Sequence, residues 1–500
     1  MTVCTVLSKK RHVAVVLAAS LALAPMPVPA QPTGVPSMGA ASSAELSPSL
    51  ERTLGNAIME QGRRDPDYID DPDVSQYLTD MGRELLKQAS GAAGHQVNVF
   101  GLRDPDINAF ALPGGHIGIH SGLVTSARSE SELASVLSHE IAHVLQRHIA
   151  RGMTRSSQSN HILLASLAGA LLAALSGSGD LAMGVAAFGQ AAAVDRQLGF
   201  SRQAEQEADR VGLQMMTRAG YDPRGMAQMF GRLARSSSLN EGVGGNVYAR
   251  THPLSVQRLS DIESRIQDSA RSHQDNPAFW FVRAKLLVIQ ARAGRASSQW
   301  IDALRRAADQ GSGVEQAAAQ YGLAFAALKQ KNPDQARREL EAIATEFRQT
   351  PQVDALSVAI ASSLDERDEA LEQAREAWQR WPRSQSVALA LAQALQNAGH
   401  DDEAVQFLAD RIKQWPDMSN LHRFQAQSYE RLDKKIAARR AMAQYYEDTG
   451  ALPTAVEHLQ QARGLTDDFY LQSELDVEIR ELKERLVSQR ALLKRFEKSG

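Results

Sequence analysis

The sequence predicts an α+β protein that is mainly helical, with a small sheet confined to its amino-terminal half. Two short segments, residues 96–102 and 115–120, have strand-like alternation, and a Pro-Gly-Gly turn leads into the second. Residues 132–150 are predicted to form one long helix, and from residue 276 onward helical patterns replace strand patterns. We therefore expect two folded domains, covering residues 50–270 and 276–490, with their boundary between residues 269 and 277.

Composition excludes several classes of protein. A chain of 500 residues is too long for one compact core, and 43% hydrophobic with 23% charged residues is ordinary globular composition. No apolar stretch runs for 18 residues without a break, which argues against a polytopic membrane protein. The formal net charge of -3 argues against a nucleic-acid partner. Cys4 is the single cysteine, so a disulfide framework and a thiolate metal site are both excluded.

The first 30 residues have the pattern of a secretory signal peptide. Lys9, Lys10 and Arg11 precede a short apolar core, and the small residues of the 28–30 segment form a cleavage site. We expect this segment to be cleaved and the protein to be exported to the periplasm; an uncleaved tether is the alternative. Residues 31–49 are rich in Pro, Ser, Ala and Gly and are expected to form a disordered leader.

The carboxyl-terminal half contains an internal repeat of 34 residues. Four alanines follow one another at this spacing: Ala336, Ala370, Ala404 and Ala438. Trp381-Pro382 recurs at the same spacing as Trp415-Pro416. Paired helices with this period and small residues at their contacts are typical of tetratricopeptide repeats. The alternative is an Ala-rich bundle with coincidental spacing, but one period accounts for both sets.

The end of the repeat array is less regular. Gly450 lies half a period out of step, so the last helix pair is expected to share a helix with its predecessor. The last apolar stripe comprises Leu475, Ile479, Leu482 and Leu486. This stripe predicts a terminal helix that caps the array, and a coiled-coil partner face is the alternative.

A metal-binding motif lies inside the predicted helix 132–150. Residues 138–143 read Ser-His-Glu-Ile-Ala-His, and residues four apart on a helix share one face. His139 and His143 are therefore expected to bind one Zn²⁺, with Glu140 as the general base that acts on the attacking water. The alternative is a helix that carries two surface histidines.

Zinc needs a third protein ligand and an open position for catalysis. The metzincin pattern would place a histidine at position 149, which is Ile149 here, and His148 comes one residue too early and is expected to face elsewhere. That pattern therefore fails.

A second helix offers the missing ligand within residues 204–212, Ala-Glu-Gln-Glu-Ala-Asp-Arg-Val-Gly. Glu205 and Asp209 are four residues apart and share a face, so Glu205 can ligate the metal. Asp209 can accept the outer N–H of a ligating histidine. Glu207 is expected to point into solvent.

Two further features are candidates for functional sites: the histidines of the second strand-like segment and a pair of apolar segments. His116 and His120 lie four residues apart on a predicted strand, roughly 13 Å, so they cannot share one tetrahedral site. We interpret residues 115–120 as an edge strand beside which an extended substrate peptide would lie. The apolar segments 162–175 and 181–194 are each too short to span a bilayer. We expect them to form a buried helical hairpin, since such apolar runs are usually core; a hairpin that contacts the membrane or covers the cleft is the alternative.

The sequence resembles the metalloprotease family of HtpX and the CAAX-prenyl endopeptidases. The resemblance rests on SHEIAHVLQRH, on SRQAEQEADRVG and on NAFALPGGHIGIHSGL, and covers about residues 50–490. It implies a zincin-like fold with one zinc ion on His139, His143 and Glu205, Glu140 as the catalytic residue and Asp209 as its support. It also implies His252, in Thr-His-Pro-Leu, as a fourth, displaceable ligand that keeps the enzyme latent. Taken alone, a histidine before proline is more often a loop residue, and an oxyanion-stabilising role for His252 is a further alternative.

The signal peptide and the repeats narrow the resemblance to periplasmic members that act in outer-membrane β-barrel assembly. It then implies an endopeptidase with chaperone activity. Its clients would be unfolded or stalled outer-membrane β-barrel proteins, and its repeats would bind the barrel assembly machinery. The alternative is a proteolytically silent chaperone or adaptor that binds clients through the repeats. The presence of Glu140 argues against it, since a silent protein has no use for the base.

Overall fold

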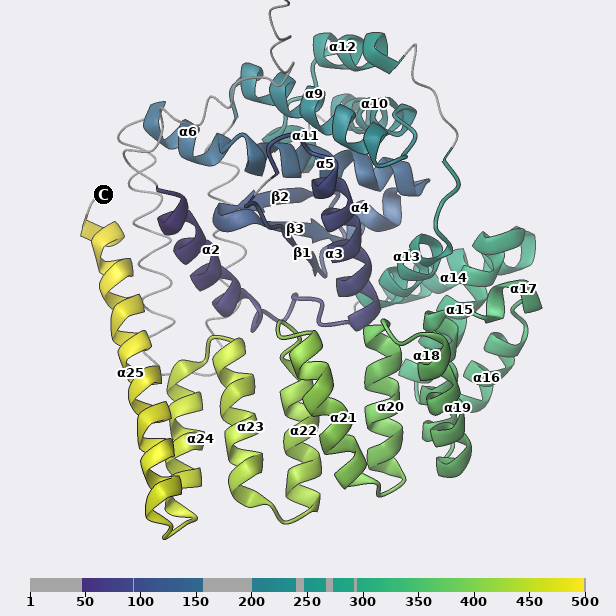
Figure 1. The fold of residues 1–500 in the computed structure, drawn as a ribbon. Helices are drawn as coiled ribbons and strands as arrows, with labels where there is room; N and C mark the ends of the chain where they lie inside the picture. Colours follow the sequence, from purple (N-terminus) through teal and green to yellow (C-terminus); the bar gives the residue numbers. More distant parts are fainter. Residues whose placement is uncertain are drawn as a thin grey trace, which may run out of the picture. The chain divides into compact units, whose positions relative to one another are not determined.

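The computed structural model describes residues 47–92, 94–155, 200–239, 247–266, 273–291 and 295–498 (Figure 1). The predicted signal peptide and the apolar segments 162–175 and 181–194 lie outside this set. Among the described helices, none has the length and apolar character needed to cross a bilayer.

The folded chain begins two residues earlier than expected. Helix α2 (Pro48–Gly62) starts inside the range predicted as a disordered leader, residues 31–49. The Ser47 side chain accepts a hydrogen bond from the backbone N–H of Leu50, and proline fits the first helical turn. The capped helix therefore places residues 48 and 49 in α2 rather than in the expected leader.

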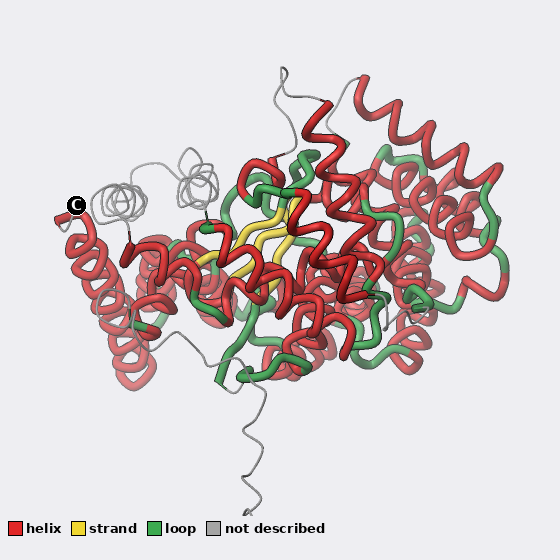
Figure 2. The backbone as a smooth tube through the Cα atoms, turned by 90° about the horizontal axis from the view of Figure 1, so that it is seen from above, coloured by secondary structure: helices red, strands yellow, loops and turns green. Residues whose placement is uncertain are grey.

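The elements up to residue 266 surround a three-stranded sheet (Figures 1 and 2). After α2 they are α3 (Pro72–Lys87), β1 (Asn98–Leu102), β2 (Ala109–Leu112), the 3₁₀ turn η2 (Pro113–Gly115), β3 (His116–His120), α4 (Ser121–Ser126), α5 (Glu130–Leu145), α6 (His148–Arg155), α9 (Arg202–Arg218), α10 (Arg224–Leu239), α11 (Val247–Thr251) and α12 (Val256–Ile266).

Strand β3 is the central strand, so the prediction that residues 115–120 form an edge strand is wrong. The order is β1-β3-β2, with β3 parallel to β1 and antiparallel to β2. The turn η2 folds β3 back between the other two strands. Gly114 and Gly115 have φ of 81° and 89°, and a Cβ at Gly115 would lie 2.3 Å from the carbonyl oxygen of Gln96. The turn is therefore specific to glycine, and β2 forms an edge of the sheet.

Helix α5 is almost wholly buried and packs against both the sheet and α9. The Ser129 side chain accepts a hydrogen bond from the N–H of Glu132 and caps its start. Its apolar residues join one core with those of the sheet and α9, among them Leu133, Ile141 and Met216. The expected single helix over 132–150 is wrong, because Arg147 has a φ of 50° and separates α5 from α6.

The carboxyl-terminal half consists of helices only in its described part (Figure 1). They are α13 (Pro277–Gln290), α14 (Arg295–Gln310), α15 (Gly313–Lys329), α16 (Pro333–Glu341), α17 (Thr345–Arg348), α18 (Pro351–Ser363), α19 (Arg367–Arg380), α20 (Gln385–Asn397), α21 (Asp401–Gln414), α22 (Asn420–Arg431), α23 (Lys435–Asp448), α24 (Leu452–Gly464) and α25 (Phe469–Lys498).

The 34-residue period is confirmed by where these helices begin and end. Its four alanines take the same place near the starts of α16, α19, α21 and α23, and each is at most 1% exposed. Trp381 and Trp415 cap the ends of α19 and α21. Small buried residues at equivalent positions allow successive helices to pack closely, as the repeat interpretation requires.

The last repeat differs from the expectation in one respect. Gly450, with a φ of 71°, ends α23, and α24 starts at Leu452, so these helices are separate and the expected shared helix is wrong. Helix α25 is the predicted cap, since Leu475, Ile479 and Leu482 are buried in a cluster with apolar residues of α24. The apolar stripe of α25 is therefore covered by α24 of the same chain and is not a free face for a coiled-coil partner.

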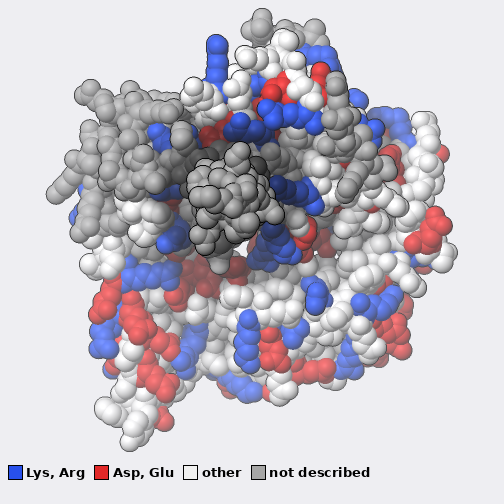
Figure 3. Space-filling model, turned by 45° about the horizontal axis from the view of Figure 1, so that its top comes forward, with Lys and Arg blue, Asp and Glu red and all other residues white. Residues whose placement is uncertain are grey.

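Charged side chains link successive repeat helices. Arg375 of α19 pairs with Glu403 of α21 at 2.7 Å, and Lys434, directly before α23, pairs with Asp402 of α21 at 2.9 Å, so these pairs join equivalent helices of successive repeats. On the face seen in Figure 3, basic and acidic side chains are intermingled over the repeat helices. Exposed pairs of this kind contribute little stability each.

Helix α13 belongs to both cores. Phe279, Val282 and Leu286 are buried in the core of the sheet-containing part, and Phe281 and Leu287 in that of the first repeats. The predicted boundary, between residues 269 and 277, falls directly before this helix. We propose that α13 is shared by the two domains and couples their stability.

Candidate metal centre

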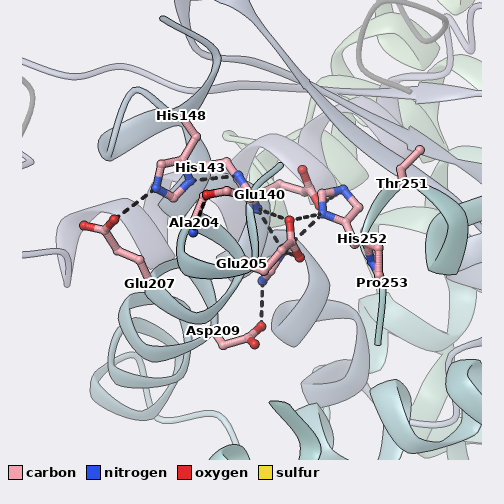
Figure 4. Close-up of polar contacts among 12 residues, drawn as sticks. Glu140, His143, His148, Ala204, Glu205, Glu207, Asp209, Thr251, His252 and Pro253 are labelled. Atoms are coloured by element: carbon pink, nitrogen blue, oxygen red, sulfur yellow. Dashed lines mark hydrogen bonds and ion pairs between the residues drawn. The ribbon is translucent and has the colours of Figure 1, made fainter. Parts of the chain in front are cut away.

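Three elements bring four candidate ligands to one point (Figure 4). Helix α5 supplies His139 and His143, α9 supplies Glu205, and His252 directly follows α11. One ligand atom from each lies within 4.8 Å of the other three, and all four residues are buried. These are the four residues that the sequence analysis named as metal ligands.

The distances describe a compact set of donors. His139 Nε2 lies 3.0 Å from His143 Nε2 and 3.4 Å from His252 Nδ1. The carboxylate of Glu205 lies 3.1 Å from His252 Nδ1 and 3.5 Å from each of the other two Nε2 atoms. Three imidazole nitrogens and one carboxylate oxygen around one point form a donor set that suits zinc.

Electrostatics favour a charged carboxylate among these imidazoles. Burial opposes its ionisation, but His252 and His139 hold the pKa of Glu205 well below its ordinary value. Burial lowers the pKa of His143 well below its usual range, which favours the neutral form that ligates metals. Burial also opposes a charge on His139, but Asp209 and Glu205 raise its pKa to about 9. A proton would therefore compete with a metal at His139.

Glu140 lies beside the ligand set. It is fully buried, and its Oε1 lies 3.6 Å from His252 Nε2. Burial raises the pKa of Glu140, which makes its carboxylate a better proton acceptor. The predicted base is thus placed where it can reach a water between itself and the ligand set.

Asp209 makes the contact that its spacing predicts. Its Oδ1 lies 3.0 Å from His139 Nδ1, the nitrogen that points away from the other ligands. Arg258, on α12, donates to both oxygens of Asp209 at 2.7 and 2.8 Å, and its Nη1 lies 2.7 Å from Glu205 Oε2. Glu205 and Asp209 of α9 are therefore held by one guanidinium.

The sequence analysis missed Arg258. The residue is 3% exposed and also donates to the carbonyl oxygen of Pro253, next to His252. Arg258, Ile262 and Ile266 lie four residues apart, and all three are buried. The sequence pattern that could have predicted this role is an arginine on the apolar face of a short helix, because a buried arginine is normally paired with a carboxylate.

His148 and Glu207 correct two expectations. His148 was expected to face away from the site, but its Nδ1 lies 2.9 Å from His143 Nδ1. Glu207 was expected in solvent, but its side chain is 12% exposed and contacts His148 Nε2 at 3.3 Å and Arg151 Nη1 at 3.1 Å (Figure 4). The break at Arg147 redirects the chain, so a continuous helix could not predict these contacts.

His116 and His120 lie outside the centre, in agreement with the distance argued from their spacing. His116 Nε2 contacts Asn56 Oδ1 at 3.0 Å, and His120 Nδ1 contacts Asp104 Oδ2 at 3.3 Å. Among the described residues, neither belongs to a group that could hold a metal.

Comparisons with known proteins agree with this geometry. The profile of peptidase family M48 matches residues 72–266, and a tetratricopeptide-repeat profile matches residues 364–428. The beta-barrel assembly-enhancing protease of Escherichia coli (strain K12) is 31% identical over 437 residues, 86% of each chain. The chain belongs to this family of M48 peptidases. It is therefore a metalloprotease, and the histidine-rich centre described above is its candidate metal site.

Other relatives align over shorter parts. A relative from Vibrio cholerae serotype O1 is 34% identical over 310 residues, which are 61% of this chain and 62% of that protein. The mitochondrial metalloendopeptidase OMA1 of Schizosaccharomyces pombe is 34% identical over 170 residues, 34% of this chain and 46% of that protein. The match to the Escherichia coli protease is longer than the M48 part of the chain and therefore extends into the repeats.

Proposed function

We propose that this protein is a zinc-dependent endopeptidase of the periplasm that acts in the assembly and quality control of outer-membrane β-barrel proteins. The convergence of four ligand atoms beside Glu140 carries the proposal of zinc chemistry. The substrate class is supported by the name of the Escherichia coli relative, a beta-barrel assembly-enhancing protease, and by the length of that match. The location is supported by the signal pattern of residues 1–30.

The residues of the centre have separate roles in this proposal. His139, His143 and Glu205 hold the ion, which when bound supplies a Lewis acid that polarises the scissile carbonyl. Glu140 accepts a proton from the attacking water and delivers it to the leaving amine. Asp209 accepts the outer N–H of His139 and so fixes the tautomer and the direction of that ring.

His252 is proposed as the displaceable fourth ligand. Its Nδ1 is turned toward Glu205 and His139, and its Nε2 toward Glu140. The ring thus occupies the space between the ligand set and the base, where the attacking water must stand. The enzyme would be latent until this ring moves away.

An extended substrate would lie along β2 rather than β3. His120 N–H donates to the Asn108 carbonyl oxygen, so in the antiparallel alternation the polar backbone groups of Ala109 and Ala111 point away from β3. In the described part of the chain, no backbone hydrogen bond to these outward groups is present. Addition of a peptide strand to a sheet edge is a recurring mode of peptide recognition. Because Ala109 and Ala111 are buried, this edge would have to be uncovered before a substrate could bind there.

The repeats are proposed to bind clients and the barrel assembly machinery. Solenoids of paired helices expose extended surfaces that suit protein partners.

The test of this function is cleavage of an unfolded outer-membrane porin by the full-length protein and by Glu140→Gln. The variant should keep about one zinc per chain and lose cleavage, because the amide cannot accept the proton. Glu205→Ala should lose zinc, whereas Glu207→Ala should retain a metal-binding centre. Cleavage by Glu140→Gln would contradict the mechanism, and a wild-type protein that binds porin but never cuts it would favour the silent chaperone.

A further inference from the structure

A second series of contacts supports the candidate metal centre, and it consists of His148, Glu207 and Arg151. His148 lies between His143 and Glu207, with its two ring nitrogens 2.9 and 3.3 Å from their polar atoms (Figure 4). The His148 side chain is 1% exposed, so water does not compete for these contacts. Arg151 completes the series by donating to the same Glu207 oxygen at 3.1 Å.

The proton positions along this series follow from the ligand role of His143. If its Nε2 binds a metal, its Nδ1 carries the proton and must donate it. His148 Nδ1 is then the acceptor, so the His148 proton is on Nε2 and is donated to Glu207. Each donor thus meets one acceptor, and the series ends on a carboxylate that Arg151 neutralises.

The two histidines of the motif are thereby supported in different ways. His139 contacts the carboxylate of Asp209 directly, whereas His143 reaches that of Glu207 through a second imidazole. Both carboxylates belong to α9, which also carries the ligand Glu205. One helix therefore orients all three proposed zinc ligands.

Helix geometry explains why an intermediate imidazole is needed. His143 lies in the last turn of α5. Arg147 has a left-handed backbone conformation that changes the chain direction, and α6 begins at the next residue, His148. This break turns His148 back toward the site, so that it fills the space between His143 and α9. The Phe200 ring packs against both imidazoles, with its centroid 4.1 Å from that of His143 and 6.1 Å from that of His148.

We propose that His148 and Glu207 are positioning residues that fix the tautomer and the direction of the His143 ring and so raise the affinity of the centre for zinc. The inference rests on the proposed ligand role of His143. It explains two sequence features together: the five-residue spacing from His143 to His148, and the presence of Glu207 between Glu205 and Asp209 on α9.

The experiment measures zinc affinity in the full-length protein by competition with a chelator. His148→Gln and Glu207→Gln should each weaken zinc binding by about 10- to 100-fold, the usual effect of removing an outer partner of a ligating histidine. The matched control is His116→Gln, the same substitution at another buried histidine, on β3, which should leave the zinc affinity unchanged.

A spectroscopic readout separates positioning from a general loss of structure. In the Co²⁺-substituted protein, the N–H protons of ligating imidazoles give exchangeable, strongly shifted proton resonances. Both variants should broaden or lose one such resonance, and Asp209→Asn should affect a different one. Glu207→Gln conserves the side-chain volume at a partly exposed site, so it tests the series even if His148→Gln does not fold.

The outcomes distinguish this inference from the proposed function. A wild-type protein without stoichiometric zinc would overturn the zinc centre itself. Wild-type zinc affinity in both variants, together with an unchanged set of exchangeable resonances, would overturn only the roles of His148 and Glu207.

Discussion

The proposed latency of the enzyme depends on His252. We expect His252→Ala to keep zinc and to raise the basal cleavage of casein, since loss of the imidazole opens the fourth position. Zinc content and casein turnover of the two proteins are the measurements. A fall in turnover of about 10²-fold at unchanged zinc content would instead assign His252 to oxyanion stabilisation.

His116 predicts a pH dependence of stability that is independent of the metal centre. Burial, assisted by Arg63, lowers its pKa from 6.5 to about 4. Between these values the unfolded chain binds a proton that the folded protein does not, so stability is lost as the pH falls. The full effect is about 3 kcal/mol.

The measurement is urea unfolding of the wild type and His116→Gln at pH 7.5 and 4.5. Glutamine does not titrate, so the variant should lose less stability over this interval. Equal losses of unfolding free energy in the two proteins would show that protonation of His116 does not destabilise the folded protein.

At the scale of elements, the contact between α5 and α9 sets the geometry of the centre. Gly212, on α9, packs against the backbone of α5, and a Cβ there would lie 3.0 Å from the N atom of His139 and 3.1 Å from Ser138. Because backbone atoms cannot move aside, Gly212→Ala should displace α9 and with it Glu205. We expect weaker zinc binding and slower cleavage.

The control for this prediction is Gly231→Ala on helix α10. A Cβ there would meet only the end of the flexible Arg235 side chain, at 3.3 Å. Alanine is the better helix former by about 1 kcal/mol, so this variant should be at least as stable as the wild type. Similar zinc affinities for Gly212→Ala and Gly231→Ala would contradict the tight-packing argument.

At the scale of the whole molecule, Lys285 joins α13 to the amino-terminal part. Its Nζ lies 2.8 Å from Asp71 Oδ2 and 2.6 Å from Asp73 Oδ2, and its side chain is 8% exposed. Lys285→Met would leave both carboxylates without their cation. We expect a loss of about 3–5 kcal/mol in the free energy of unfolding, measured by urea denaturation.

Two variants make this prediction specific. Lys434→Met removes a lysine from an exposed pair with Asp402 and should cost at most about 1 kcal/mol. Adding Asp73→Asn to Lys285→Met should restore part of the stability, since one uncompensated charge is removed. A loss in Lys285→Met no larger than that in Lys434→Met would mean that this pairing does not couple the two parts.

The sequence by itself determined the features that depend on local spacing. Helical periodicity places His139 beside His143 and Glu205 beside Asp209, and the structure has both pairs on common faces. A 34-residue period likewise predicted the helix positions of the array. Residues a few positions apart in one element have a fixed relation, so the pattern is sufficient.

Only the tertiary structure decided the features that depend on distant contacts. Strand order placed β3 at the centre, the break at Arg147 turned His148 toward His143, and packing brought Arg258 to Asp209. No local pattern encodes such contacts, because the partners are far apart in sequence or separated by a change of chain direction. The centre therefore combines two locally encoded pairs, the ligands His139 and His143 and the ligand Glu205 with its neighbour Asp209, and contacts that only the packed molecule makes fix their orientation.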